Sequence, residues 1–230
     1  MPDGLRTDGA RREVERLRAD PADPDALFAG VVRALARHGL RFAGACWHLT
    51  DHETGLFTWT GAAGELPGDF RSALENEFLE DDVAKYHDIA GRPVPVAALS
   101  AETEGRPRRS LRFRTQLAPD GFGDELRVAF ADAYGRWGSL GLFAEGRFSA
   151  RDTAGVAALV PGVARAIREG IAMRAEGAPG DGPGVLVLDA GDRVVTRDAR
   201  AAELLEDGAG NGVLPGMVHV LAARVRAAGA

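Results

Sequence analysis

The chain has 230 residues, 45% of them hydrophobic, which is enough to bury the core of one large or two small domains. Its formal net charge of -6 argues against a surface built to neutralise phosphates, so we expect no direct nucleic-acid binding by this chain. The single cysteine, Cys46, permits neither an internal disulfide nor a zinc site made of cysteines from one chain.

The first residues lack the pattern of a targeting signal. Met1–Ala10 is polar and has no basic start followed by an apolar run, and no later apolar stretch has the length needed to cross a bilayer. We therefore expect a cytoplasmic protein that does not associate with a membrane.

Two helices are predicted at the start of the chain. Residues 8–18 form a charged helix with Val14 and Leu17 as its strong apolar positions, and this segment is interpreted as a lead-in or a dimer contact. Asp23 followed by Pro24 is a helix-start signal, and apolar residues at helical spacing continue to Gly39. This second helix is the first that can contribute substantially to a core.

Strands dominate the middle of the sequence. Residues 43–49 and 56–60 read as a hairpin around a turn of Asp and Gly, and residues 94–99 read as a short strand that its two prolines confine to an edge. A second hairpin lies within residues 117–144, where Leu126, Val128 and Phe130 alternate before a polar break. A helix bearing Phe70, Leu74 and Phe78 is predicted between these hairpins.

The last third begins with a capping box. Ser149 and Asp152 have the Ser-x-x-Asp spacing, and they predict one long helix over residues 150–175 that Pro161 bends without ending. Residues 176–184 have the composition of a linker. A small hairpin, a helix over residues 199–205 and a final amphipathic helix follow, the last with Val218, Leu221 and Val225 on its apolar stripe.

The order of these elements resembles a GAF domain, in which an antiparallel sheet is backed by the terminal helices. Four stretches resemble the sensory half of actinobacterial LuxR-type helix-turn-helix regulators or the opening of a PAS domain. They are ACWHLTDHETGL (45–56), LAPDGFGDELR (117–127) with the run 109–114 before it, WGSLGLF (137–143) and, for PAS, GVLVLDAGDRVVTRDARAAELL (184–205). The resemblance implies a regulator in which a DNA-binding module follows the PAS-like region, and this chain ends before such a module.

The sequence thus predicts an α+β fold with four segments. These are a helical lead-in (1–22), a GAF-like sensory domain with an antiparallel sheet flanked by helices (23–175), a linker (176–184) and a small, incomplete PAS-like segment (185–230). A sensory role follows from the resemblance. The expected partners are a small-molecule ligand and a second copy of the chain in a homodimer.

The candidate ligand-pocket residues lie on predicted strands. Cys46 and His48 are two apart and face the same side of a strand, and Trp59, Phe130 and Trp137 are aromatic residues that either line a pocket or fill the core. No cofactor is indicated. The Cys-x-His-x-x-x-His pattern ending at His52 also admits a metal or redox sensor, although a closed zinc site needs four ligands.

No catalytic residue is predicted, and we expect a protein that is not an enzyme. The nucleophile elbow Gly-x-Ser-x-Gly and the phosphate loop Gly-x-x-x-x-Gly-Lys are absent from the sequence. Asp124 and Glu125 are neighbours on a strand and point to opposite faces, so they are interpreted as polar residues at a sheet edge. A purely structural dimerisation module remains an alternative to the sensor.

One basic cluster has two interpretations. Arginines 106, 108, 109, 112 and 114 surround Phe113, and they either form a solvated helix face or bind an anion or the acidic patch at residues 80–82.

Overall fold

The computed structural model describes residues 4–17, 23–52, 54–177, 185–189, 191, 193–208 and 216–229. These residues form two compact units. The first comprises Met1–Asp69 and Asp81–Gly177, and the second comprises Phe70–Glu80 and Ala178–Ala230. Among the helices described, none is both long and apolar enough to span a bilayer.

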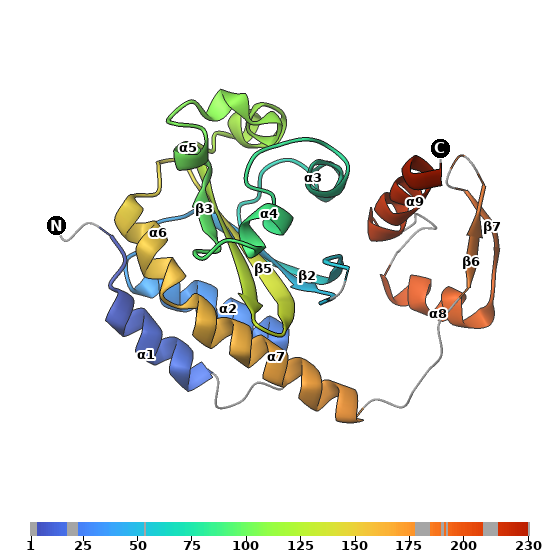
Figure 1. The fold of residues 1–230 in the computed structure, drawn as a ribbon, viewed down its shortest axis with the longest axis horizontal. Helices are drawn as coiled ribbons and strands as arrows, with labels where there is room; N and C mark the ends of the chain where they lie inside the picture. The colour runs from blue at the N-terminus through green and yellow to red at the C-terminus, as the bar shows by residue number, and fades with distance from the viewer. Residues whose placement is uncertain are drawn as a thin grey trace. The chain divides into compact units, whose positions relative to one another are not determined.

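The first unit is built on a five-stranded antiparallel sheet with the order β2-β1-β5-β4-β3. The predicted α+β fold, with an antiparallel sheet flanked by helices, is confirmed (Figure 1). The strands are β1 (Gly44–Thr50), β2 (Phe57–Gly64), β3 (Val96–Ala98), β4 (Asp124–Asp132) and β5 (Gly135–Ala144).

Regular helices cover one face of this sheet, which we call the first face. They are α1 (Thr7–Leu17), α2 (Pro24–Arg37), α6 (Ala150–Ala157) and α7 (Val160–Gly177) (Figure 1). The opposite, second face is covered by short segments: α4 (Tyr86–Ala90), α5 (Leu99–Glu102), η1 (Pro107–Arg109), η2 (Phe113–Leu117) and η3 (Ala118–Asp120).

The main core lies between the first face and its helices. Alternate residues of the central strands point into it, including Trp47, Leu126, Phe130 and Leu142, and α2 adds the fully buried Phe28. The rings of Phe28 and Trp47 stack, with centroids 6.3 Å apart. Packing of this kind follows directly from the period-two alternation of the strands.

Helix starts agree well with the sequence signals. The side chain of Asp23 accepts a hydrogen bond from the backbone N–H of Asp25 at 3.0 Å, and Pro24 occupies the first helical position. The charged helix α1 contributes Ala10 and Val14 to the main core and packs against α2. Residues 1–3 and 18–22 of the predicted lead-in lie outside the described residues.

The single long helix expected over residues 150–175 is wrong, because the structure has two helices. α6 ends at Ala157, and α7 begins at Val160 with Pro161 in its first turn. Proline lacks a backbone N–H and fits the first turn of a helix, so Pro161 starts a new helix here instead of bending one. Residues 178–184 of the predicted linker lie outside the described part of the chain.

The second unit combines α3 (Phe70–Phe78) with the C-terminal elements. These are the hairpin β6 (Leu186–Leu188) and β7 (Val194–Arg197), α8 (Ala199–Gly208) and α9 (Gly216–Gly229). α3 contacts α9, and a guanidinium nitrogen of Arg71 lies 3.1 Å from Nε2 of His219.

The apolar stripe predicted for the last helix is only partly correct. Among the α9 residues whose burial the structure describes, 216–226, Val220 is buried, whereas Leu221 and Val225 are exposed. The incomplete PAS-like character of residues 185–230 stays a prediction.

The capping box of α6 gives a direct test of the fold. Ser149 Oγ accepts from the backbone N–H of Asp152 at 3.1 Å, and Asp152 accepts in return from the N–H of Ser149 at 3.0 Å. We expect Ser149→Ala to lower the free energy of unfolding of the first unit by about 1 kcal/mol. Because all three tryptophans lie in this unit, urea unfolding followed by tryptophan fluorescence reports on it.

Ser149→Thr is the matched control, since threonine also caps helices. Equal losses in the alanine and threonine variants would show that the cap does not stabilise α6.

Candidate functional site

The second face of the sheet buries a group of charged side chains that contact one another. Arg112 reaches Glu125 on β4 with its Nε 2.5 Å from Oε2, and Nε of Arg127 lies 2.7 Å from Oε1 of the same carboxylate. All three side chains are at most 7% exposed. A carboxylate held between two guanidinium groups is satisfied on both oxygens, which is the condition for burying it.

A second carboxylate joins these residues from the segment before α4. Asp82 Oδ2 accepts from the backbone N–H of Arg112 at 2.8 Å and from Ser110 Oγ at 3.0 Å, and Arg112 also donates to the carbonyl of Val83 at 2.6 Å. We call Asp82, Arg112, Glu125 and Arg127 the ion cluster. It has two positive and two negative groups, so its formal charge is zero.

The ion cluster shifts the pKa of its central carboxylate. Burial by itself raises the pKa of Glu125, but the charges of Arg112 and Arg127 and their hydrogen bonds outweigh burial and lower it. Glu125 is therefore ionised at neutral pH despite being 2% exposed.

Two of the predicted pocket residues lie on this same face. His48 stacks on Phe57 with ring centroids 3.9 Å apart, and its Nδ1 lies 2.9 Å from Thr60 Oγ1. Burial, assisted by the charge of Arg127, lowers the pKa of His48 to about 3. His48 is therefore neutral under all physiological conditions.

Cys46 has the opposite shift for a related reason. Burial, with a further contribution from the charge of Glu125, raises the pKa of its thiol to about 12. A thiol of this kind stays protonated near neutrality, and protonated thiols are poor nucleophiles and poor metal ligands. Of the described residues, no three His, Cys, Asp or Glu side chains are grouped so that they could hold a metal ion.

The predicted aromatic residues are not gathered around Cys46 and His48. Phe130 is 2% exposed within the main core on the first face. Trp137 is half-buried against that core, stacks on His52 and donates to Asp132 at 2.8 Å, whereas Trp59 is 56% exposed on β2. The structure thus brings two of the five predicted residues together.

The interpretation of Asp124 and Glu125 as polar residues at a sheet edge is only partly correct. They precede the residues of β4 that pair with β3, Leu126–Val128, but both carboxylates are buried. They do point in opposite directions, because Asp124 accepts from the backbone N–H and hydroxyl of Ser100 at 2.8 and 2.6 Å and from Phe148 N–H at 3.0 Å. Each is a structural anchor for a different part of the chain.

The arginines of the basic cluster, residues 106–114, differ in burial and in their partners. Arg112 pairs with Asp82, as one of the two interpretations predicted, whereas Arg106 and Arg109 form exposed ion pairs with Glu104. A groove of about 460 Å³ lies beside Arg108, with Phe113 and Phe122 among its lining residues.

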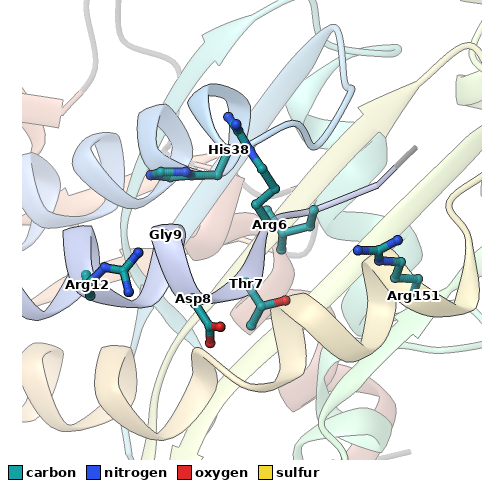
Figure 2. Close-up of a pocket in the computed structure, with 8 residues that line it drawn as sticks. Arg6, Thr7, Asp8, Gly9, Arg12, His38 and Arg151 are labelled. Carbon is teal, nitrogen blue, oxygen red and sulfur yellow. The ribbon is translucent and has the colours of Figure 1, made fainter. Parts of the chain in front are cut away.

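A further groove lies at the start of α1, next to the end of α2 and the start of α6 (Figure 2). Its volume is about 570 Å³, and it is lined by Leu5, Arg6, Thr7, Asp8, Gly9, Arg12, His38 and Arg151. Arg6 donates to the carbonyl of Arg37 at 3.0 Å, and His38 contacts Glu13 at 3.0 Å. Arg6 and His38, two basic residues that line the groove, are thus already bonded to other groups of the protein.

Sequence reasoning missed Arg127 and Tyr86. The guanidinium carbon of Arg127 lies 4.5 Å from the centroid of the Tyr86 ring, and both side chains are buried over the second face. A signal for Arg127 was available, since Glu125 and Arg127 are two apart on a strand and share a face. Tyr86 gave no such signal, because its place depends on the fold of a loop.

No protein-family model matches the sequence, and no curated protein matches it. Among solved structures, the LBD domain of VqsR from Pseudomonas aeruginosa is similar over 70% of this chain and 95% of its own, with 13% identity and a TM-score of 0.46. The GAF domain of a two-component sensor histidine kinase from Bacillus halodurans is similar over 68% and 99%, with 13% identity and a TM-score of 0.40. Similarity at this level does not identify functional residues, so the site is interpreted from the residues of this chain.

The ion cluster gives a stability prediction. Arg112→Met removes one of the two cations that compensate Glu125, and we expect a loss of about 3–5 kcal/mol in the free energy of unfolding. The exposed control Arg165→Met, which breaks a pair with Glu169 on α7, should leave the free energy of unfolding almost unchanged. Similar small losses from both variants in urea unfolding would contradict a stabilising ion cluster.

His48 gives a prediction about pH. Its pKa is lowered in the folded protein, so between pH 6.5 and about 3 the unfolded chain binds one proton more than the folded chain. Stability is therefore lost as pH falls below 6.5, and the wild type should lose about 2 kcal/mol more than His48→Gln between pH 7 and pH 5. Urea unfolding of both proteins at both pH values measures this, and equal losses would refute the prediction.

Proposed function

We propose that the first unit is the sensory domain of a LuxR-type transcriptional regulator, and that it binds a small molecule at the second face of its sheet. The observation that supports this most is the ion cluster, a set of ionised side chains buried beneath short and irregular segments. In this proposal the chain is a homodimer, it catalyses no reaction, and it makes no direct contact with DNA.

The two faces of the sheet differ in the kind of backbone that covers them. The first face has four regular helices, whereas the second is covered partly by the π-helical turn Phe113–Leu117 and by segments with left-handed residues, Ala84 at φ 52° and Glu104 at φ 53°. Non-glycine residues with such angles and π-helical turns are concentrated at functional sites. A cover with these backbone features suits a site that admits a ligand.

The charges of the second face favour one class of ligand. Arg127 shares the carboxylate of Glu125 with Arg112 and lies over the Tyr86 ring. A ligand carboxylate can pair with Arg127 in place of Glu125, and an aromatic or aliphatic body can pack beside Tyr86. We therefore propose an organic carboxylate as the ligand.

α7 provides a route from the site to the rest of the protein. It packs on β4 and β5, and Arg168 on this helix is 3.0 Å from Asp132 at the end of β4. A ligand that favours one position of β4 also favours one position of α7, and the helix carries this preference toward later residues. The break before Val160 separates α7 from α6, so α7 can adjust without α6.

The alternatives remain distinguishable from this proposal. A dimerisation module without a ligand needs only the amphipathic helices, and it gives the buried charges of the second face a structural role alone. A metal or redox sensor at Cys46 is disfavoured by a thiol pKa of about 12.

Native mass spectrometry tests the ligand proposal. The purified 230-residue chain should carry a small molecule that denaturation releases, or it should gain thermal stability from members of a panel of aliphatic and aromatic carboxylates. Arg127→Met should lower the affinity about tenfold or more, because a charge-assisted hydrogen bond is lost, whereas Arg165→Met should bind like the wild type. Ligand-free protein that no carboxylate stabilises would contradict the proposal.

A further inference from the structure

The two edges of the sheet differ in how well they are protected. β3 at one edge has three residues and follows Pro93 and Pro95, a combination that leaves little backbone for a partner strand. β2 at the other edge has eight residues. Within the described part of the chain, the backbone of residues 58–64 makes hydrogen bonds only to β1.

β2 also lacks the side chains that normally keep an edge strand from pairing. Its sequence, FTWTGAAG, has no charged residue and no proline, although the chain as a whole has a net charge of -6. Every residue after Phe57 is exposed or half-buried, and Trp59 is 56% exposed. Natural proteins usually block such an edge with lysine, proline or a bulge. The register of β2 with β1 is irregular between Phe57 and Trp59, but residues 59–64 pair regularly with β1 and carry none of these devices, so this part of the edge indicates a partner strand.

Charged side chains lie near both ends of β2, and among them Arg136 and Glu65 have opposite signs. Arg136 lies beside Gly55 just before the strand, where a Cβ atom on Gly55 would be 3.3 Å from its guanidinium nitrogen. Glu65 follows the strand directly and is exposed. In an antiparallel pair of two β2 strands, the start of each strand lies beside the end of the other. Arg136 of each copy then approaches Glu65 of the other, and the uncharged strands lie between these two pairs.

We propose that β2 pairs with β2 of a second copy in antiparallel orientation, which joins two five-stranded sheets into one continuous sheet. A two-fold axis near the middle of β2 satisfies both edges with the same contacts, so the assembly closes at two copies. An acidic chain repels its own copies over most of its surface, and this neutral strand with opposite charges at its ends is complementary to itself. The inference rests on the homodimer proposed above and does not depend on the ligand.

Sedimentation velocity over a range of concentrations tests the interface with the full chain. We expect the wild type to dimerise and Ala62→Lys to raise the dimer dissociation constant at least about tenfold, because each copy then places a lysine within the otherwise uncharged pair of strands. Ala36→Lys, the same change at an exposed alanine in the last turn of α2, should leave it unchanged.

Charge exchange is the second arm of the test. Glu65→Arg should weaken the dimer, and adding Arg136→Glu should restore it at least in part, because the two pairs form again with reversed signs. Hydrogen exchange of wild-type residues 57–64 should slow as the concentration rises, which tests the interface without any variant.

The outcomes separate the two proposals. A wild type that stays monomeric at all concentrations would overturn the homodimer together with this interface. A dimer that Ala62→Lys leaves intact, with no concentration-dependent protection of residues 57–64, would overturn the β2 interface alone.

Discussion

The carboxylate of Glu125, held between two arginines, is the constraint on which the second face of the sheet depends. Arg112 comes from the segment before η2, and it also binds Asp82 and the carbonyl of Val83 from the segment before α4. One buried charge on the sheet thus fixes two separate loops. Because isolated buried charges are so costly, these loops have few alternative positions while the cluster is intact.

This arrangement explains why the two faces of one sheet have different chemistry. The first face is held by apolar side chains such as Phe28 and Phe130, which tolerate small shifts because their packing is not directional. The second face combines an apolar cluster that includes Phe113 and Phe143 with directional hydrogen bonds between charged groups, and these hydrogen bonds either form or break. The second face therefore suits a site that switches between two conformations, and the first face suits a stable support for that site.

Much of the fold could be predicted from local patterns. The Asp23–Pro24 helix start, the Ser149–Asp152 capping box and the alternation of Leu126, Val128 and Phe130 all depend on residues close in sequence. The failures have a physical reason in each case. A proline such as Pro161 is compatible both with a bend inside one helix and with the first turn of a new helix. The apolar residues around Pro161 have helical spacing in both cases, so the sequence does not distinguish them.

The candidate site was less predictable, because it is assembled from distant segments. Cys46 and His48 lie two apart on one strand, so their shared face follows from local sequence. The cations around Glu125 come from residues 112 and 127, and the loop that carries Arg112 has no repeating pattern. Trp59 and Phe130 illustrate the same limit. An aromatic residue on a strand does not by itself indicate which face of the sheet it lies on or how exposed it is to solvent.

The ion cluster also has a consequence for how this sequence can change over generations. A single substitution in the main core, such as Leu126 to another aliphatic residue, alters volume and is often tolerated. Loss of any one of Arg112, Glu125 or Arg127 leaves a buried charge without its partner. Substitutions at these three positions are therefore expected to be correlated. The evolutionary unit on the second face is therefore the set of charges, because exchanging one of them alone costs more stability than a conservative change in the main core.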